Sequence, residues 1–382
     1  MQKKDSLQVV VISIIIFTAI LGIGFIVPLL PIFAERFGGD VFVGVLFSGF
    51  AISRAIASPI VSTLSDKYGR KFFILSGLIL YSVFSIFYAH SKNAAELLVS
   101  RLLHGVASSM IIPVAFSYIG DISPRGQEGK YFSFIGASLL LGFGLGPVLG
   151  GYLADVFGED YAFYAMAIIG IIAFVQAGLF IKESEDRAKA SQSFLEIITG
   201  ALKSRLTLKS SIIWLLVIIQ RGALLAFLPI LLDKYGYSKS SIGLSMTSYA
   251  ISSSIVQYSF SPIVDKIKNK IRASFILGAL ASILIFPVAF ISNIVSLTVI
   301  TSISGSLGAV IYPLILSEIS GEAKEFSRVG ATIGVMEFFF SLGMIIGPII
   351  LGFIAKFFGL ESVFLCSSIF LSSIFLLMLT KC

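Results

Sequence analysis

Long apolar segments alternate with short charged clusters along the whole chain. A helix that crosses the hydrocarbon core of a bilayer needs about 20 mostly apolar residues. Twelve segments reach about that length, and polar or charged clusters separate them. The pattern predicts twelve membrane-spanning helices, at about residues 8–34, 41–64, 72–90, 94–118, 129–154, 160–181, 210–233, 239–264, 273–291, 294–317, 328–355 and 361–379.

The composition supports this interpretation. Hydrophobic residues make up 57% of the chain and charged residues only 13%. Soluble domains carry about 25% charged residues, so a soluble protein of this composition could not cover its own surface. We therefore expect an all-α membrane protein with the lipid bilayer as its solvent.

Lys and Arg are distributed unevenly between the predicted loops. If the N-terminus is cytoplasmic, loops on that side hold twenty of the 28 Lys and Arg residues, and the other side holds five. Such a bias sets the orientation of a membrane protein, because positively charged loops stay inside. We expect a multi-pass protein of the plasma membrane with both termini in the cytoplasm. The net charge of +7 then reflects topology, and no nucleic-acid partner is expected.

The chain also repeats itself. Four pairs of segments match in order, at offsets of 198, 203, 200 and 201 residues: PIFAERFG at 31–38 with PILLDKYG at 229–236, SPIVSTLSDKYGRK at 58–71 with SPIVDKIKNKIRAS at 261–274, Pro113 with Pro313, and GPVLGGYLADVFG at 146–158 with GPIILGFIAKFFG at 347–359. A nearly constant offset over the whole length indicates a duplication. We expect an N-terminal six-helix bundle at 1–182, a cytoplasmic linker at 183–209 and a C-terminal six-helix bundle at 210–382. Two parallel halves of this kind are a known transporter architecture.

Three motifs resemble those of the major facilitator superfamily, and the resemblance spans all twelve predicted helices. PIVSTLSDKYGRK at 59–71 resembles the family's signature between helices 2 and 3, although Ser62 stands where the family usually has glycine. LLVSRLLHGVA at 97–107 resembles the pattern of helix 4. LGFGLGPVLGG at 141–151 resembles the helix 5 pattern of the drug–proton antiporter branch.

The first motif is predicted to be a gating loop. The residues that match the signature are Asp66, Gly69, Arg70 and Lys71. The resemblance implies that Asp121, at the end of helix 4, joins the loop arginine in a charge network that latches the two halves in the outward-facing state. The alternative is a plain turn with a topological positive charge.

The helix 5 motif is predicted to be a helix–helix interface. Small residues let two membrane helices approach closely, and a proline kinks a helix. A dinucleotide-binding loop is excluded, because no strand precedes the glycines. The resemblance implies a contact with the eighth predicted helix, at 239–264. The matching residues are Gly142, Gly146, Pro147, Gly150 and Gly151.

Five Arg, His and Glu residues lie well inside the predicted spans, away from the ends, where charge is costly and marks a partner or a pathway. Glu337 is the only carboxylate deep in any span. The resemblance places helices 1, 4, 7 and 10 around a central cavity, so Arg101, His104 and Arg221 are expected to face substrate. It also packs helix 2 against helix 11, so Arg54 and Glu337 could meet. A structural ion pair or a packed neutral imidazole is the alternative for these residues.

Two transport functions fit these residues. One is proton-coupled efflux of a small amphiphilic compound by alternating access, with Glu337 as the protonation site. The other is transport of an organic or phosphorylated anion, because the arginines outnumber that one carboxylate. A non-transporting membrane sensor is a remote third hypothesis.

Other classes of function are not expected. GQEGKYFS at 126–133 lacks the spacing of a phosphate-binding loop, so energy must come from a gradient. With only two histidines, no metal site, no Ser-His-Asp set, no cofactor and no enzyme activity are predicted. The expected partners are a small-molecule substrate, protons and the bilayer, and we expect a monomer.

Overall fold

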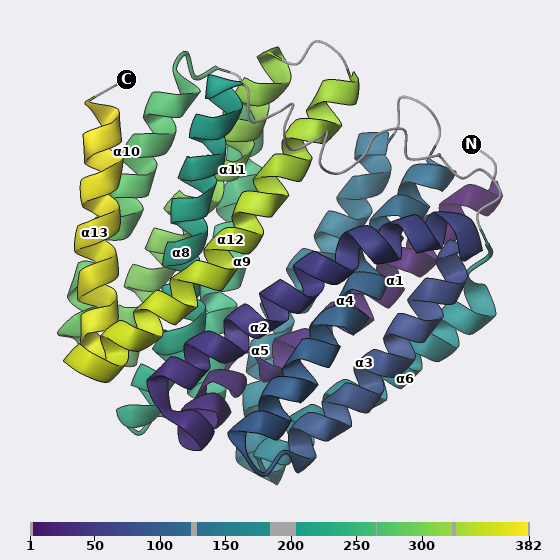
Figure 1. Ribbon diagram of the computed structural model, residues 1–382, viewed down its shortest axis with the longest axis horizontal. Helices are drawn as coiled ribbons and strands as arrows, with labels where there is room; N and C mark the ends of the chain where they lie inside the picture. The colour runs from purple at the N-terminus through teal and green to yellow at the C-terminus, as the bar shows by residue number, and fades with distance from the viewer. Residues whose placement is uncertain (1–2, 124–127, 184–203, 265, 323–325, 381–382) are drawn as a thin grey trace. The chain divides into compact units, whose positions relative to one another are not determined.

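The computed structural model describes residues 3–123, 128–183, 204–264, 266–322 and 326–380, and these contain α-helices and one short 3₁₀ helix but no β-strand (Figure 1). The elements are α1 (Lys3–Ile26), α2 (Leu30–Tyr68), α3 (Arg70–His90), α4 (Ala94–Ile122), α5 (Glu128–Phe157), α6 (Glu159–Phe180), α8 (Arg205–Lys234), α9 (Lys239–Val264), α10 (Lys270–Ile283), η1 (Phe286–Ala289), α11 (Ile294–Glu322), α12 (Phe326–Phe358) and α13 (Glu361–Leu379).

The all-α membrane fold is confirmed. Within these ranges, eleven helices are long and apolar enough to cross a membrane. The remaining α-helix of the described chain is α9, with the sequence KSSIGLSMTSYAISSSIVQYSFSPIV. Its many serines lower its hydropathy, although its length would also span a bilayer.

The boundary between the first two helices differs from the prediction. The first span was expected to continue to residue 34, but α1 ends at Ile26 and α2 begins at Leu30. Pro28 and Pro31 lie at this boundary. Proline lacks an amide hydrogen and favours the first turn of a helix, so the chain turns here and starts again. The early part of α2 is then broken at Gly39, with φ 70° and ψ −174°.

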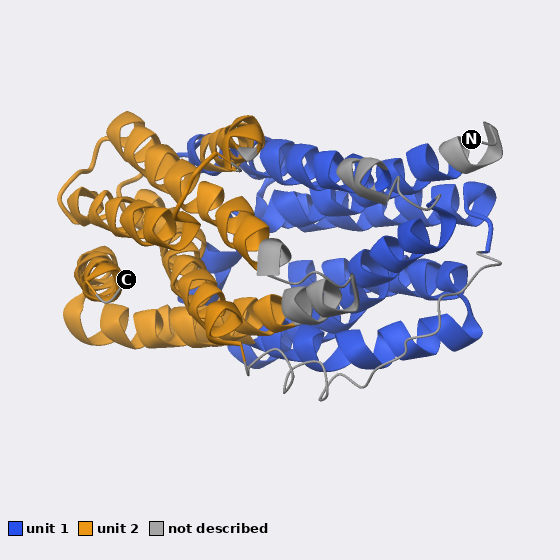
Figure 2. Ribbon diagram, turned by 90° about the horizontal axis from the view of Figure 1, so that it is seen from above, with its two compact units in different colours: residues 1–37, 49–191, 238–247 blue, residues 38–48, 192–237, 248–382 orange. Residues whose placement is uncertain are grey.

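The described chain forms two compact units (Figure 2). Unit 1 contains residues 1–37, 49–191 and 238–247, and unit 2 contains residues 38–48, 192–237 and 248–382. The start of α9 therefore packs within unit 1, and the residues that follow the break in α2 pack within unit 2.

The same helix pairs occur inside both units. In unit 1, α1 packs against α5, and α3 packs against α4 and α6. In unit 2, α8 packs against α12, and α10 packs against α11 and α13. These are equivalent pairs under the sequence repeat, since α8 stands about 200 residues after α1. The duplicated sequence thus produces duplicated packing.

Candidate functional site

One residue, Gly69, connects α2 to α3 in the predicted gating loop. Its φ of 114° and ψ of 141° lie in a region that side chains avoid. Its amide donates to the carbonyl oxygen of Ser65 at 3.1 Å. This sharp turn brings the end of α2 and the start of α3 together.

The charged residues around this turn form a buried network inside unit 1. Arg70 forms ion pairs with Asp66 and, at 3.0 Å, with Asp121. Its guanidinium also donates to the Ser65 hydroxyl at 2.6 Å. The side chains of Arg70 and Asp121 are each only 3% exposed. Removing one partner of such a buried pair costs about 3–5 kcal/mol, so the network holds α2, α3 and α4 in one arrangement.

Lys71 has a different role in the structure from the other residues of the loop. Its ammonium donates to the carbonyl oxygen of Gly178 at 2.9 Å, near the end of α6. The lysine thus fixes α6 against the start of α3.

Glu183 is part of this site, although the sequence analysis assigned it to the linker. Its carboxylate accepts from the backbone amides of Arg70 at 2.7 Å and Lys71 at 3.3 Å. It therefore caps α3, whose own N-cap residue Gly69 offers no side chain. A carboxylate at a helix N-terminus satisfies free amides and interacts favourably with the helix dipole. An acid just after α6, together with a helix that begins without a capping side chain, was the available signal.

Gln8 extends these contacts to α1 and α4. Its side-chain amide donates to the carbonyl oxygen of Phe180 at 3.0 Å. Its side-chain oxygen accepts from the Tyr118 hydroxyl at 2.9 Å and from the Lys182 amide at 3.0 Å. The segment that leaves α6 is therefore tied to α1, α3 and α4.

The helix 5 motif presents two neighbouring stripes of residues. Gly142, Gly146 and Gly150 recur every fourth residue and face α1. A β-carbon on Gly146 would lie 2.5 Å from the Cα of Gly24, and one on Gly150 would overlap the backbone of Phe25. The main glycine contact is therefore with α1, and not with the eighth predicted helix as expected. Residues four apart share one helix face, which explains the stripe.

The second stripe contains Pro147 and Gly151, and it contacts the beginning of α9. A β-carbon on Gly151 would overlap the carbonyl of Lys239, and one on Gly243 would overlap the carbonyl of Pro147. The expected contact with the eighth predicted helix is present, but this second stripe makes it. Asp155 strengthens it by accepting from the amide of Lys239 at 2.9 Å.

An equivalent crossing occurs in unit 2. There, Gly44 of α2 packs on the carbonyl of Pro348 in α12, and a β-carbon on Gly352 would lie 2.7 Å from the carbonyl oxygen of Asp40. Both crossings pair a Pro-x-x-x-Gly stripe with a glycine of the facing helix.

Arg101 and His104 are enclosed within unit 1. His104 has no exposed surface, and its Nδ1 lies 3.0 Å from the Tyr88 hydroxyl. The rings of Phe50 and Tyr81 also lie against the imidazole, with centroids 5.8 and 5.0 Å away. The Arg101 guanidinium lies over the Phe50 ring at 4.3 Å. These contacts surround both side chains with aromatic groups, where the sequence analysis expected them to face substrate.

Arg54 lies in unit 1 and Glu337 in unit 2. Arg54 is partly buried and Glu337 is exposed. The contact expected between them stays a prediction.

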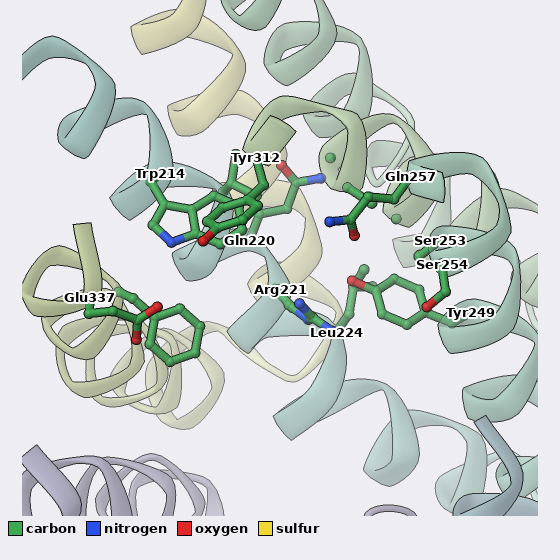
Figure 3. Close-up of a pocket in the computed structure, with 15 residues that line it drawn as sticks. Trp214, Gln220, Arg221, Leu224, Tyr249, Ser253, Ser254, Gln257, Tyr312 and Glu337 are labelled. Carbon is green, nitrogen blue, oxygen red and sulfur yellow. The ribbon is translucent and has the colours of Figure 1, made fainter. Parts of the chain in front are cut away.

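Unit 2 contains an open cavity of about 240 Å³ among α8, α9, α11 and α12 (Figure 3). It contains two of the predicted site residues, Arg221 and Glu337. In Figure 3, Arg221 lies between Glu337 on one side and Tyr249 on the other. The lining residues are Trp214, Val217, Gln220, Arg221, Leu224, Tyr249, Ser253, Ser254, Gln257, Gly305, Gly308, Ala309, Tyr312, Glu337 and Phe340.

Gln220 is a buried polar residue of this lining with hydrogen bonds to two neighbouring helices. Its side-chain amide donates to the Ser304 hydroxyl at 3.0 Å, and its oxygen accepts from the Ser282 hydroxyl at 2.9 Å. These bonds tie α8 to α10 and α11, so the neighbouring Arg221 projects from a rigid wall.

The described residues contain no group of three or more His, Cys, Asp or Glu side chains that could hold a metal ion. The side chains that line the cavity offer ionic pairing, hydrogen bonding and aromatic contact.

The chain is similar to known proteins over most of its length. It is 31% identical to an uncharacterised MFS-type transporter of Methanocaldococcus jannaschii, with 95% of each chain covered. It is 32% identical to the quinolone resistance protein NorA of Staphylococcus aureus, covering 90% of this chain and 89% of NorA.

Solved structures have the same fold at low sequence identity. A bacterial homologue of the human lysosomal transporter Spinster matches with a TM-score of 0.87 and 14% identity, covering 100% of this chain and 98% of that one. The nucleoside transporter NupG matches with a TM-score of 0.79 and 15% identity, covering 97% and 98%. The human organic anion transporter MFSD10 matches with a TM-score of 0.69 and 17% identity, covering 99% of each chain.

The model of the Major Facilitator Superfamily matches residues 12–324 and 211–381, which together span nearly the whole sequence. The chain belongs to the Major Facilitator Superfamily, whose members are multi-pass membrane transporters.

Proposed function

We propose that the protein exports a small amphiphilic compound across the plasma membrane in exchange for protons, by alternating access. The observation that carries this proposal is the cavity of unit 2, where Arg221 and Glu337 lie beside aromatic side chains on membrane-spanning helices. Charged groups within a membrane span are costly and mark a substrate or ion pathway. The similarity to NorA, a resistance protein, supports export.

Glu337 is the proposed coupling group. A carboxylate changes its affinity for a proton when its solvation and its neighbouring charges change. Alternating access would change both, and a site must differ in affinity between the two states to do coupled work.

The two proposed halves are residues 1–182 and 210–382, and 183–209 connects them. In this scheme Asp66, Gly69, Arg70 and Asp121 act as the cytoplasmic latch, and both termini lie in the cytoplasm of a monomer. The hydrogen bonds of Glu183 to the start of α3 support a mechanical connection between linker and latch.

Transport of an organic or phosphorylated anion is the second candidate. The observation in its favour is that Arg221 is the cationic group of the cavity. In that case Glu337 would serve as the proton site alone.

Flux into proteoliposomes with an imposed pH gradient tests the proposal. We expect an amphiphilic compound to accumulate against its gradient when protons flow the opposite way, and accumulation to stop when an ionophore dissipates the pH gradient. If the rate of uptake is the same with and without the pH gradient for every compound, proton coupling is contradicted. Accumulation of simple organic anions alone would favour the second candidate.

A further inference from the structure

The membrane-spanning segment that begins with α10 is interrupted. α10 ends at Ile283, and the 3₁₀ helix η1 follows at Phe286–Ala289. Pro287 lies in η1 and has no amide hydrogen, so an α-helix that continued through it would lose a hydrogen bond. The equivalent helix of unit 1, α3, has Phe87 at the corresponding position, at an offset of 200 residues, and runs unbroken from Arg70 to His90. The interruption is therefore a feature of unit 2 that the sequence repeat does not share.

The interruption releases a backbone carbonyl. The amide of Ile285 donates to the carbonyl oxygen of Ser282 at 3.1 Å, three residues back, whereas an α-helix would direct it to Ala281. The carbonyl oxygen of Ala281 accepts from the hydroxyl of Ser304 in α11, at 2.8 Å and in a buried position. A buried carbonyl without a partner is costly inside a membrane. Ser304 thus satisfies the acceptor that the break in α10 creates.

This bond sets the direction of a chain of hydrogen bonds that ends beside the cavity. A serine hydroxyl has a single hydrogen, and Ser304 donates it to Ala281, so Ser304 acts as an acceptor toward α8. The side-chain nitrogen of Gln220 donates to Ser304 at 3.0 Å, and its side-chain oxygen accepts from Ser282 at 2.9 Å. A flipped Gln220 amide would place two acceptors against each other, so one orientation is fixed.

The orientation of Gln220 determines how α8 faces the cavity. Arg221 follows Gln220 and points about 100° away from it around the helix, because an α-helix has about 3.6 residues per turn. Gln220 is buried against α10 and α11, whereas Arg221 is exposed in the cavity (Figure 3). When the contacts of Gln220 fix the rotation of α8 about its axis, the direction in which Arg221 leaves the helix is fixed as well.

We propose that the break in α10 positions Arg221 in the cavity, through Ser304 and Gln220. This inference rests on the proposed function, in which Arg221 lies in the substrate pathway, and it assigns the residues that hold Arg221 there. The carbonyl of Ala281 is free to accept from Ser304 alone only while α10 is broken, so the geometry of α10 and the direction of Arg221 are coupled. Ser304 and Gln220 are positioning residues, because they act through Arg221.

The reactivity of a cysteine at position 221 measures how α8 faces the cavity. Cys366 and Cys382, the only cysteines of the chain, are replaced by serine, and either Arg221→Cys or Ser254→Cys is introduced. Both positions line the cavity, one on α8 and the other on α9. Their rates of reaction with N-ethylmaleimide, a small uncharged reagent, are measured on the purified full chain in detergent. The ratio of the two rates separates a change in α8 from a general loosening of the cavity.

We expect Ser304→Ala and Gln220→Met to lower this ratio about tenfold, because the face of α8 that carries position 221 is no longer held toward the cavity. Methionine has about the volume of glutamine, so Gln220→Met removes the hydrogen bonds and keeps the packing. Ser306→Ala is the matched control on α11, since the Ser306 hydroxyl donates to the Ser302 carbonyl of its own helix at 2.8 Å. It should leave the ratio unchanged. A ratio that stays at the parental value in both Ser304→Ala and Gln220→Met would overturn the proposal.

A substitution of the proline tests the origin of the acceptor. Pro287→Ala supplies an amide, so α10 can continue and Ile285 can donate to Ala281. The ratio should fall in this variant, because Ile285 then competes with Ser304 for that carbonyl. Ser304→Ala should also lower the unfolding temperature less in the Pro287→Ala background than in the parent, since the carbonyl keeps a partner. An unchanged ratio together with equal temperature shifts in the two backgrounds would overturn the role of the break.

The labelling ratio does not depend on transport, so this proposal and the proposed function fail separately. If the ratio falls as expected but no amphiphilic compound is accumulated in proteoliposomes under a pH gradient, the positioning of Arg221 stands and proton-coupled export is wrong. If a pH gradient drives accumulation but the ratio does not fall, export stands and the positioning role of Ser304 and Gln220 is wrong.

Discussion

At position 69 a single residue separates two membrane-spanning helices, and two features of the structure favour glycine there. Its backbone has φ 114°, and a β-carbon there would lie 2.5 Å from Oε2 of Glu183. The first feature is conformational strain and the second is a collision. Variants can separate the two contributions.

We expect Gly69→Ala to lower stability by about 1–3 kcal/mol from backbone strain, with the collision in addition. In a Glu183→Ala background the collision is absent, so the further loss caused by Gly69→Ala should be smaller. Thermal unfolding of the four proteins in detergent measures this coupling. Gly236→Ala is the matched control, because Gly236 has φ 81° and no neighbour within 4 Å of its β-carbon position. Strictly additive effects of the two substitutions would contradict the contact.

The carboxylate of Glu337 gives a second prediction at this scale. We expect Glu337→Gln to abolish accumulation driven by a pH gradient, because glutamine cannot carry a proton. Exchange of substrate down its own gradient should persist at higher substrate concentration. Proteoliposome flux with and without a pH gradient measures both rates. Glu318→Gln, a carboxylate that pairs with Lys270 at 3.8 Å, is the control and should keep accumulation. If Glu337→Gln still concentrates substrate, coupling lies elsewhere.

The sequence indicated these residues to different degrees. The contact between Arg70 and Asp121 could be predicted from the sequence, because the resemblance to the family's loop motif implies it. Glu183 was missed, since nothing local to it shows that the chain returns to the start of α3. Arg101 and His104 were expected to face substrate, but side-chain direction depends on aromatic neighbours such as Phe50 that contact them only in the folded chain.

At the scale of elements, α5 shows how one helix serves two neighbours. Its glycines at positions 142, 146 and 150 face α1, while Pro147 and Gly151 face α9. Close approach of helix backbones stabilises membrane bundles through van der Waals contact, and only small residues permit it. The sequence predicted close packing here, but the choice between two neighbouring helices required the three-dimensional arrangement.

We expect Gly146→Ala to destabilise the packing of α1 against α5, because its β-carbon would lie 2.5 Å from the Cα of Gly24. A measured loss of about 1–3 kcal/mol is typical of overpacking. The matched control is Gly136→Ala in the same helix, where no atom lies within 4 Å of the new β-carbon. Alanine favours a helix over glycine by about 1 kcal/mol, so this control should be neutral or stabilising. Equal effects of the two substitutions on the unfolding temperature would contradict the assigned interface.

Helix boundaries depend on similar local chemistry. The spans themselves could be predicted because runs of about 20 mostly apolar residues match the thickness of a bilayer and are rare in soluble proteins. The first boundary was wrong because apolar residues continue through Pro28 to Pro31 without a charged cluster. Hydropathy predicts which segment spans the membrane, whereas the positions of residues such as Pro28, Pro31 and Gly39 determine where the helix ends or is broken.

At the scale of the whole molecule, the duplication explains why close crossings come in pairs. Pro147 and Gly151 of α5 contact the start of α9 inside unit 1, and Pro348 and Gly352 of α12 contact the early part of α2 inside unit 2. The repeat offset of 201 residues between GPVLGG and GPIILG predicts this equivalence from sequence. The substrate could not be predicted in the same way, because it depends on which side chains line one cavity.

The paired crossings lead to a prediction about alternating access. Both involve the beginnings of α2 and α9, near loops that the charge bias assigns to the outside. We propose that they seal the external side of the pathway when access is from the cytoplasm. Gly151→Leu should prevent the backbones from meeting, because a leucine side chain needs space that the Lys239 carbonyl occupies. The equivalent change Gly352→Leu should have the same effect.

A single reporter cysteine can measure this opening. Cys366 and Cys382 are the only cysteines of the chain, so both are first replaced by serine, and Ser254→Cys is introduced in the cavity lining. A membrane-impermeant maleimide applied from outside should then label Ser254→Cys several-fold faster in the Gly151→Leu and Gly352→Leu backgrounds, while uphill transport falls. Gly136→Leu, on α5 but with no atom within 4 Å of the β-carbon, should leave both rates unchanged. If labelling stays at the parental rate in both leucine variants and transport persists, the crossings are static packing and the external seal lies elsewhere.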